Sequence, residues 1–326
     1  MNRGKNVLGL AGFVAWILAM LLFGKTTSVG QNCTGDVCRD CPDNSTGKIN
    51  IMDLGTGFYG GLQGGLYPNG ENSRPITHND AGLAFTDAVV PLDMNGEEDF
   101  VNGKIVLLSI GFSNAQEEYC YFKDKADALP QRNPYLVVVN GAIAGWPIEK
   151  IIDPTINQVY WEGDDNAIPP IKGVEDFLED ADANWGQVQA IWFKTANLGP
   201  TETDFRDYIL TLRNQYIDGM AILQEKFPNN HLCYLSDRTF GGYSLDLGNP
   251  EPYAYWTGWA VKRLIQRQLD GNLPYGEDSP WLSWGPYLWA DGVIERSDGV
   301  KWQCDDFRVN DRRHPSDCGR TRSRIC

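Results

Sequence analysis

The chain has 326 residues, of which 42% are hydrophobic and 22% charged. It is therefore long and apolar enough for one large α/β domain or two small ones, and its composition excludes a largely disordered chain. The formal net charge is −15, and a strongly acidic surface repels phosphate groups and anionic lipids, which argues against nucleic acid and against peripheral membrane binding.

The N-terminal residues have the pattern of an export signal. Arg3 and Lys5 precede an apolar run from Val7 to Phe23, and small and polar residues follow. This pattern predicts a signal peptide, residues 1–30, that is cleaved before Gln31. The alternative is an uncleaved anchor, because a run of 17 apolar residues is at the lower limit for a membrane span. We expect a secreted or extracytoplasmic protein that contacts a membrane only if residues 7–23 remain as an anchor.

Eight cysteines in an exported chain predict disulfide bonds, with the pairing left open. Six of them gather near the two ends of the chain: Cys33, Cys38, Cys41, Cys304, Cys318 and Cys326. The first three lie in residues 31–48, a polar linker in which a zinc site is the alternative, although no histidine or fourth cysteine lies nearby. The same linker contains glycosylation sequons at Asn32 and Asn44.

Residues 49–326 are expected to form one domain with a loop-rich extension at 49–103. The extension is rich in Gly, Asn and Pro, which predicts loops and one short strand at Ile49–Leu54. After it, short apolar runs predict buried parallel strands at Lys104–Gly111, Leu136–Asn140, Val188–Phe193 and His231–Ser236. Helices are expected at Ala115–Ala128, Thr201–Phe227 and Tyr253–Leu269, followed by Trp-rich loops.

Strands that alternate with helices in this way indicate a parallel sheet covered on both faces. The sequence therefore predicts an α/β fold with a doubly wound, flavodoxin-like parallel sheet and a loop-rich N-terminal extension. Reactive side chains of such a sheet belong in the loops beyond the carboxyl ends of its strands.

A serine follows the first predicted strand, in the segment Gly111-Phe-Ser-Asn114. Gly111 permits a sharp turn, and Ser113 would open the next helix, where backbone N–H groups are unpaired. The alternative is a serine that only caps the helix, which is common. By itself this motif leaves both interpretations open.

A second candidate lies near the end of the chain, in Asp311-Arg-Arg-His-Pro-Ser316. Asp311 precedes His314 by three residues, so its carboxylate can accept a hydrogen bond from one ring nitrogen while the other faces a serine. The alternative is a solvated surface pair. Of the other two histidines, His231 begins a buried strand and is expected to be structural, whereas His78 in the extension stays open as a residue that borders the site.

Together these segments resemble the sequence blocks of the SGNH/GDSL hydrolases. The serine after the first strand and the late Asp-x-x-His-Pro-Ser, followed by Gly319, resemble the first and last blocks. Asn140-Gly-Ala-Ile-Ala-Gly145 resembles the second block, and Lys194-Thr-Ala-Asn197 takes the place of the third. The chain departs from the family where Gly111-Phe-Ser-Asn114 replaces Gly-Asp-Ser-Leu and where Gly-x-Asn-Asp is missing from the third block. The resemblance covers residues 104–319.

The resemblance implies a serine hydrolase that cleaves an ester. Ser113 would be the nucleophile, His314 the general base, and Asp311 the residue that fixes the imidazole tautomer. The backbone N–H groups of Ser113 and Gly145 and the side chain of Asn197 would bind the oxyanion. No metal or organic cofactor is required.

Two other interpretations remain open. One is an α/β-hydrolase, since Gly111-Phe-Ser-Asn-Ala115 nearly matches Gly-x-Ser-x-Gly, although that fold places its serine after several strands. The other is a non-catalytic extracellular carbohydrate-binding or adhesion protein on the same fold. The predicted export and the aromatic residues that gather between Trp256 and Trp302 favour a small-molecule ester or an acylated polysaccharide as substrate. A lipid ester is also compatible.

Overall fold

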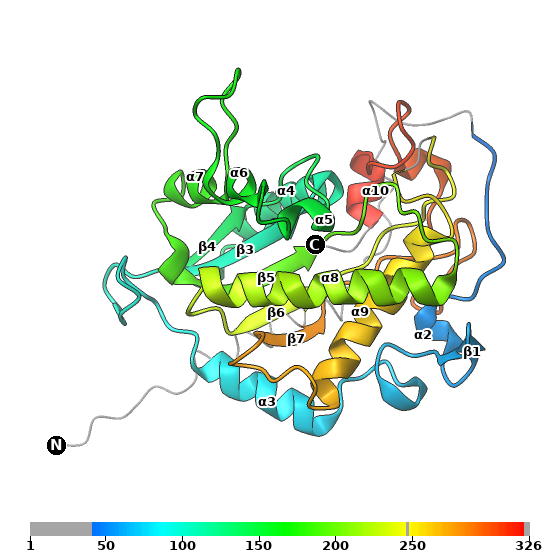
Figure 1. Cartoon of the computed structure of the whole chain (residues 1–326), viewed down its shortest axis with the longest axis horizontal. Helices are drawn as coiled ribbons and strands as arrows, with labels where there is room; N and C mark the ends of the chain where they lie inside the picture. The colour runs from blue at the N-terminus through cyan, green and yellow to red at the C-terminus, as the bar shows by residue number, and fades with distance from the viewer. Residues whose placement is uncertain (1–40, 246–247, 323–326) are drawn as a thin grey trace.

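The computed structural model describes residues 41–245 and 248–322. This part of the chain forms a mixed α/β fold built on a five-strand parallel sheet (Figure 1). In chain order the strands are β3 (Ile105–Gly111), β4 (Leu136–Asn140), β5 (Val188–Lys194), β6 (Leu232–Leu235) and β7 (Trp281–Trp284). The predicted α/β class and parallel sheet are confirmed.

The spatial order of the strands is β4-β3-β5-β6-β7. The second strand, β4, therefore lies on one side of β3, and the later strands β5, β6 and β7 lie on the other side. Ser109 pairs with Asn140, and Gly111 pairs with Lys194. Because parallel strands end at the same edge of a sheet, the exit of β3 lies between the exits of β4 and β5. In open α/β sheets, ligands bind beyond the carboxyl ends of the strands where the strand order reverses.

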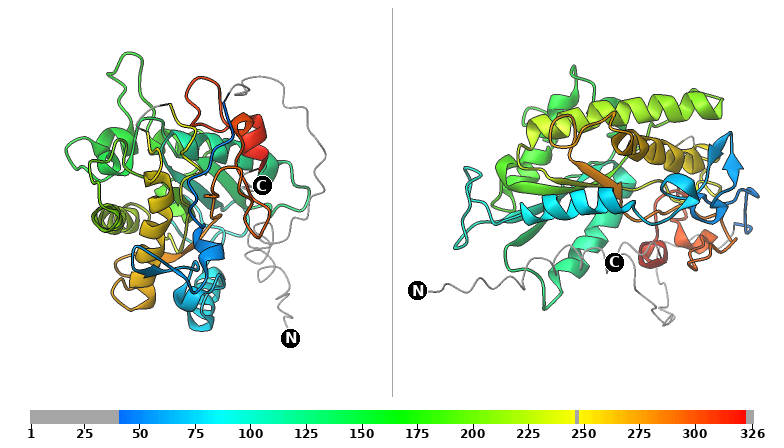
Figure 2. Two further views of the ribbon diagram at one scale, coloured as in Figure 1. Left: turned by 90° about the vertical axis from the view of Figure 1, so that its right-hand side faces the viewer. Right: turned by 90° about the horizontal axis from the view of Figure 1, so that it is seen from below.

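Helices cover both faces of the sheet (Figure 2). One face carries α3 (Ile76–Asp87) and α4 (Ser113–Asp127). The opposite face carries α5 (Ile148–Ile151), α6 (Asn157–Glu162), α7 (Val174–Glu179), α8 (Phe205–Lys226) and α9 (Tyr253–Leu269). Successive strand side chains point to opposite faces, so Leu107 and Leu108 of β3 belong to two different buried clusters.

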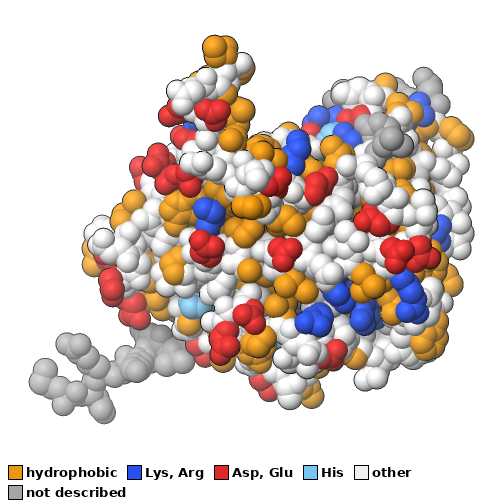
Figure 3. All heavy atoms as spheres, viewed as in Figure 1, with side chains coloured by type: hydrophobic (Ala, Val, Ile, Leu, Met, Phe, Trp, Pro, Cys, Tyr) orange, Lys and Arg blue, Asp and Glu red, His pale blue; other side chains and the backbone are white. Residues whose placement is uncertain are grey.

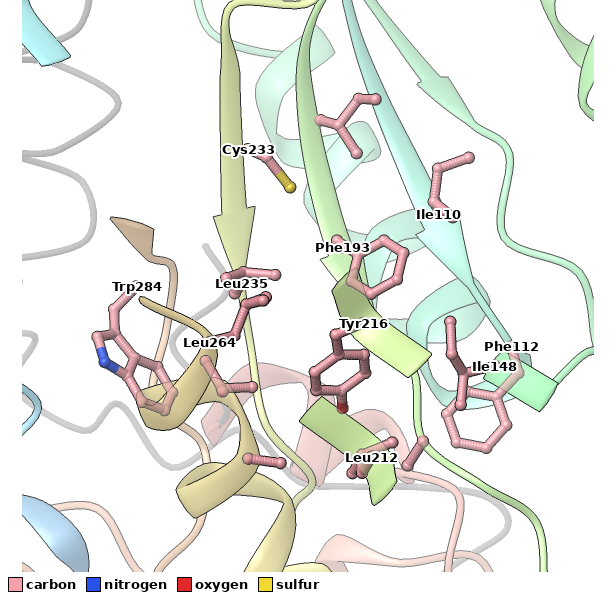
Figure 4. Close-up of a cluster of buried hydrophobic side chains, with 14 of the residues drawn as sticks. Ile110, Phe112, Ile148, Phe193, Leu212, Tyr216, Cys233, Leu235, Leu264 and Trp284 are labelled. Carbon is pink, nitrogen blue, oxygen red and sulfur yellow. The ribbon is translucent and has the colours of Figure 1, made fainter. Parts of the chain in front are cut away.

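One of these clusters lies beneath α8 and α9 (Figure 4). The side chains that meet there come from two strands and from α8: Phe193, Leu235, Leu212 and Tyr216. Leu212 and Tyr216 are four residues apart and therefore share one face of the helix. Tyr216 also donates its hydroxyl to the Thr195 carbonyl at 2.6 Å, which fixes α8 to the exit of β5.

The prediction of a strand at Ile49–Leu54 is wrong. This segment contains the short helix α2 (Ile51–Leu54), because the Asn50 side chain caps it by accepting from the Asp53 N–H at 2.9 Å. The rest of the extension is also more regular than loops. It contains β1 (Phe58–Tyr59), β2 (Leu62–Gln63), the 3₁₀ turn η1 (Pro68–Gly70) and α3.

The helix α3 forms through contacts with β7 that its own sequence does not show. A Cβ atom at Gly82 would collide with the Trp281 ring, so only glycine permits this packing. The ring nitrogen Nε2 of His78 lies 2.7 Å from the Leu282 carbonyl. Tertiary contacts therefore override the weak helix propensity of a segment that contains Gly, Asn, Asp and Thr.

One further strand and two helix boundaries differ from prediction. The strand β7 lies in the region predicted to be Trp-rich loops. The sequence does not predict it, because a run of four residues is too short for its periodicity to be recognised. α4 begins at Ser113 and not at Ala115. α8 begins at Phe205 and not at Thr201, since the Asp204 side chain caps it there. The remaining short elements are η2 (Trp185–Gln187), η3 (Cys304–Asp306) and α10 (Asp317–Arg322).

The segment 41–48 has no regular secondary structure and is fixed to the domain by specific contacts. Cys41 forms a disulfide with Cys304 across 263 residues of sequence, so it does not belong to a zinc site. Thr46 donates its N–H and its hydroxyl to Asp291, each at 2.7 Å. Cys318 is also disulfide-bonded, and Cys120 and Cys233 are free thiols.

The predicted export signal, residues 1–30, lies outside the described residues, as do Asn32 and most of the predicted linker. Within residues 41–245 and 248–322, no helix is long and apolar enough to cross a membrane. The Asn44 sequon is exposed. Acidic side chains are spread over the face of the molecule seen in Figure 3, in keeping with the net charge of −15.

The Cys41–Cys304 disulfide leads to a stability prediction. Replacement of Cys304 by Ser should lower the free energy of unfolding by about 2–5 kcal/mol, because the unfolded chain loses a cross-link that closes a long loop. Urea titration measures this loss, and Cys120→Ser, which removes a free thiol, is the matched control. Peptide mapping of the unreduced protein should recover Cys41 linked to Cys304, and recovery of both as free thiols would contradict the disulfide.

Candidate active site at the exits of β3, β4 and β5

The end of β3 turns sharply into α4 at Gly111. This residue has φ of 154°, and a Cβ atom added to it would collide with the Lys194 carbonyl of the neighbouring strand. Only glycine therefore permits β3 and β5 to lie this close at their exits. Ser113 follows as the first residue of the 15-residue helix α4, where backbone N–H groups have no partner within the helix.

The hydroxyl of Tyr160 fixes this turn from the opposite face of the sheet. It accepts a hydrogen bond from the Gly111 N–H at 3.0 Å and lies 3.2 Å from the carbonyls of both Gly111 and Gly141. The side chain is fully buried, and burial raises the pKa of Tyr160 well above its ordinary value, so the hydroxyl stays protonated. Tyr160 thus connects the exits of β3 and β4, which no sequence motif reveals.

The segment that bears His314 is a tight loop held by backbone hydrogen bonds. The Arg308 N–H donates to the His314 carbonyl at 3.0 Å, and Phe307 forms an antiparallel bridge with Pro315. Inside the loop, Oδ1 of Asp311 accepts from the N–H groups of Arg313 at 2.9 Å and His314 at 3.0 Å. The three-residue spacing of Asp311 and His314 therefore forms a side-chain turn that orients the carboxylate.

The structure brings Ser113, His314 and Asp311 into one hydrogen-bonded series. His314 Nε2 lies 2.7 Å from Ser113 Oγ, and His314 Nδ1 lies 2.6 Å from Asp311 Oδ2. The side chain of Asn114 donates to the Arg313 carbonyl at 3.0 Å and so attaches the start of α4 to the histidine loop. Ser113 and His314 are 201 residues apart in sequence, and Asn114 is a positioning contact that sequence motifs do not indicate.

The ionisation of the pair suits a neutral imidazole beside a carboxylate. Burial, together with the charges of Arg313 and Arg238, holds the pKa of His314 below its ordinary value of 6.5, although Asp311 opposes this shift. Burial would raise the pKa of Asp311, but its hydrogen bonds from His314 and Arg313 outweigh that effect and hold the pKa below its ordinary value. At neutral pH, His314 can accept a proton and Asp311 carries a charge.

The other two predicted site residues flank Ser113 on neighbouring strand exits. Gly145 lies in an exposed turn after β4 with φ of 80°, and its N–H makes no hydrogen bond to any described residue. Asn197 lies after β5 and is 8% exposed, with its Oδ1 buried and without a hydrogen-bond partner in the described part of the chain. Its carbonyl accepts from the Asn249 side chain at 2.6 Å, which anchors the loop. No direct hydrogen bond joins Gly145 or Asn197 to Ser113.

The remaining histidines lie elsewhere. His78 is buried between α3 and β7, where its ring stacks on Trp281 with centroids 5.0 Å apart. His231 precedes β6 at the opposite edge of the sheet from Ser113, and its N–H donates to the Gln189 carbonyl. His78 therefore does not border the site, and His231 has the structural position that the sequence predicts.

A buried ion pair joins α4 to the end of β5. Lys194 Nζ donates to Glu118 Oε2, and both side chains are 0% exposed. Burial lowers the pKa of Lys194, and the charge of Glu118 opposes this shift. The pair fixes the helix that starts at Ser113 to the neighbouring strand. No group of three or more metal-ligating side chains was found in residues 41–245 and 248–322.

The geometry supports one kind of chemistry. A neutral imidazole between a serine hydroxyl and a carboxylate can take the hydroxyl proton as the oxygen attacks an electrophilic carbon. The first backbone N–H groups of α4, beside Ser113, have no partner within the helix and can donate to an oxygen on which negative charge develops.

Comparisons with known proteins add little to this geometry. No model of a known protein family matches the chain, and no curated protein matches it. Among solved structures, YxiM from Bacillus subtilis is similar at 10% identity and a TM-score of 0.36, over 68% of this chain and 55% of that protein. An extracellular lipase from Streptomyces rimosus is similar at 11% identity and a TM-score of 0.33, over 68% and 97%. The chain thus matches about half the length of YxiM, and similarity at this level says nothing about activity.

The buried ion pair leads to a second stability prediction. Lys194→Met should lower the free energy of unfolding by about 3–5 kcal/mol, because it leaves Glu118 buried without its donor. The double variant Lys194→Met/Glu118→Leu should recover most of the loss, since both charges of the Lys194–Glu118 pair are then gone. Lys123→Met on the same helix, which breaks the exposed Lys123–Asp127 pair, is the control and should cost less than about 1 kcal/mol. Urea unfolding of the four proteins would contradict the pairing if Lys194→Met were as stable as the control.

Proposed function

We propose that this protein is a serine hydrolase of the SGNH type that cleaves an ester bond. The observation that carries the proposal is the series Ser113–His314–Asp311, with 2.7 Å between Ser113 Oγ and His314 Nε2 and 2.6 Å between His314 Nδ1 and Asp311 Oδ2. An N-cap serine or a solvated surface pair would not require both contacts at once. Neither alternative explains why residues 201 positions apart meet at the carboxyl edge of the sheet.

The proposed reaction is acyl transfer in two halves. Ser113 Oγ attacks the ester carbonyl while His314 Nε2 takes its proton, and the imidazolium then gives this proton to the departing alcohol. Water repeats the sequence on the acyl-enzyme and releases the acid. Asp311 holds the proton on Nδ1, so that Nε2 is free to act as the base.

For the oxyanion we propose three donors: the N–H of Ser113, the N–H of Gly145 and the side-chain amide of Asn197. The strand order supports this set, because β4 and β5 flank β3 and their exits therefore lie on either side of Ser113. The N–H of Gly145, which donates to no described residue, supports this set further. Loss of one such donor commonly costs about 10²–10³ in rate.

The strand order also supports the finer description of the fold. Numbered along the chain, the five strands lie in the order 2-1-3-4-5. This is the strand order of flavodoxin-like sheets, which supports our proposal of a doubly wound, flavodoxin-like arrangement. Ser113 follows the first strand of this sheet, whereas α/β-hydrolases place their serine after several strands. We therefore favour the SGNH type over the α/β-hydrolase.

We propose an acylated carbohydrate or a small-molecule ester outside the cytoplasm as the substrate. The export signal predicted for residues 1–30 supports this location, and the Cys41–Cys304 disulfide is compatible with it. No cofactor is assigned to the reaction.

Covalent labelling tests the nucleophile. A fluorophosphonate probe should label the wild-type protein and fail to label Ser113→Ala, because only an activated serine attacks phosphorus at a useful rate. Ser109→Ala is the control and should still be labelled. Ser109 lies four residues before Ser113, and its buried hydroxyl donates to the Asn140 side chain. Equal labelling of Ser113→Ala and wild type would reject Ser113, and no labelling of any folded form would favour the carbohydrate-binding alternative.

The pH dependence tests the base. Because His314 must be neutral to accept a proton and burial holds its pKa below 6.5, kcat/KM should rise with pH, with a midpoint below 6.5, and then level off. Asp311→Asn removes the charge that raises the pKa of His314, so the midpoint should move to still lower pH while kcat falls by about 10⁴.

Alanine variants at His314 and His231 complete this test. His314→Ala should lower kcat by about 10⁴–10⁶. His231→Ala, at the opposite edge of the sheet, should retain wild-type turnover. A folded His314→Ala protein with wild-type kcat would overturn the assignment.

A further inference from the structure

Arg238 has a buried guanidinium that the proposed reaction does not use. The residue follows β6 and is 2% exposed, and its Nε and Nη1 are buried without a hydrogen-bond partner in the described part of the chain. A buried charge without hydrogen bonds is costly, and such groups in native proteins call for an explanation.

The strand order places Arg238 on the Ser113 side of the sheet. Ser113, Asn197 and Arg238 follow β3, β5 and β6, which are neighbours in this order. The guanidinium reaches across the exit of β5, because its Cζ lies 4.8 Å from the ring centroid of Phe112, the residue before Ser113. Its positive charge is also among those that lower the pKa of His314. Arg238 therefore lies beside the serine and its base.

Glu118, Asp311 and Asp237 make no hydrogen bond to the Arg238 guanidinium. Glu118 accepts from Lys194, and Asp311 accepts from the His314 ring. Asp237 accepts from the N–H groups of Leu288 at 2.6 Å and Trp289 at 3.2 Å. Burial lowers the pKa of Arg238 to about 10, and the charge of Glu118 opposes this shift. At neutral pH the group is charged, and its Nε and Nη1 donate to no described residue.

We infer that Arg238 is a specificity residue that binds a carboxylate on the substrate, next to the ester that Ser113 attacks. The inference rests on the proposed hydrolase function and deepens it by naming a class of substrate. A guanidinium presents a planar fork of donors that matches a carboxylate, and such charge-assisted bonds are strong in a desolvated site. Substrates that carry this carboxylate would gain binding energy that a neutral ester of the same size lacks.

Two pairs of esters test this inference, one for each side of the scissile bond. 4-Nitrophenyl hemisuccinate against 4-nitrophenyl butyrate places the carboxylate on the acyl side. 4-Carboxyphenyl acetate against phenyl acetate places it on the alcohol side. For each pair the measured quantity is the ratio of kcat/KM for the charged ester to that for the neutral ester, so intrinsic reactivity cancels between variants.

Arg238→Met should lower this ratio by about 10- to 100-fold in at least one pair, as expected for a lost charge-assisted bond. Arg238→Lys should retain part of the ratio, because the charge remains and the fork is lost. The control Arg213→Met removes a cation from α8 that hydrogen-bonds its neighbour Asn214, and it should leave both ratios unchanged. Unchanged ratios in Arg238→Met, or an equal loss on charged and neutral esters, would overturn the inference.

A binding measurement separates this inference from the proposed function. Two ligand pairs, monoethyl succinate with ethyl butyrate and 4-carboxyphenyl acetate with phenyl acetate, are titrated into Ser113→Ala and into Ser113→Ala/Arg238→Met by calorimetry, with circular dichroism and thermal unfolding as checks of folding. Tighter binding of a carboxylate ligand that weakens at least about tenfold in the double variant supports the carboxylate site even if the wild type hydrolyses no ester. Equal affinity of Ser113→Ala for the two members of each pair would refute it even if the wild type is an active esterase.

Discussion

The close approach of Gly111 to the Lys194 carbonyl determines how the exits of β3 and β5 are arranged. A side chain at Gly111 would push the two strands apart at the point where the chain turns into α4. Because the strands stay together there, α4 starts with Ser113 beside β5, and its Glu118 reaches the buried end of Lys194. Tyr160 fixes the same turn from the other face. The histidine loop then packs on a helix start whose position is already fixed, through the bond from Asn114 to Arg313.

Local patterns predict the parts of the fold that are determined locally. The buried strands β3 to β6 are continuous apolar runs, and α9 lies at Tyr253–Leu269 as its periodicity indicates. Asp311 and His314 are recognisable because they lie only three positions apart, so their interaction depends on one loop. The errors fall where distant residues decide: α3 depends on the contact between Gly82 and Trp281, and β7 on a pairing with β6.

The supporting residues of the site were missed for the same reason. Tyr160 and Asn114 act through hydrogen bonds to chain segments 49 and 199 residues away, and the Arg238 guanidinium lies against a ring on a different strand exit. A tyrosine in a short helix or an arginine after a strand carries no motif. Sequence patterns identify groups that carry chemistry, whereas the groups that hold them become visible only when the sheet is assembled.

The wide separation of Ser113 and His314 has a consequence for synthesis and folding. A ribosome makes the chain from its N-terminus, so β3 to β7 and all the helices that cover them precede the loop at 311–314. A nascent chain that has already formed the sheet presents a serine at the head of α4 with no imidazole to take its proton. The hydroxyl is then an ordinary alcohol with a high pKa and low nucleophilicity. Chemical competence would thus arise in one late step, when the loop docks on Asn114, and truncated or stalled chains would remain inert toward esters.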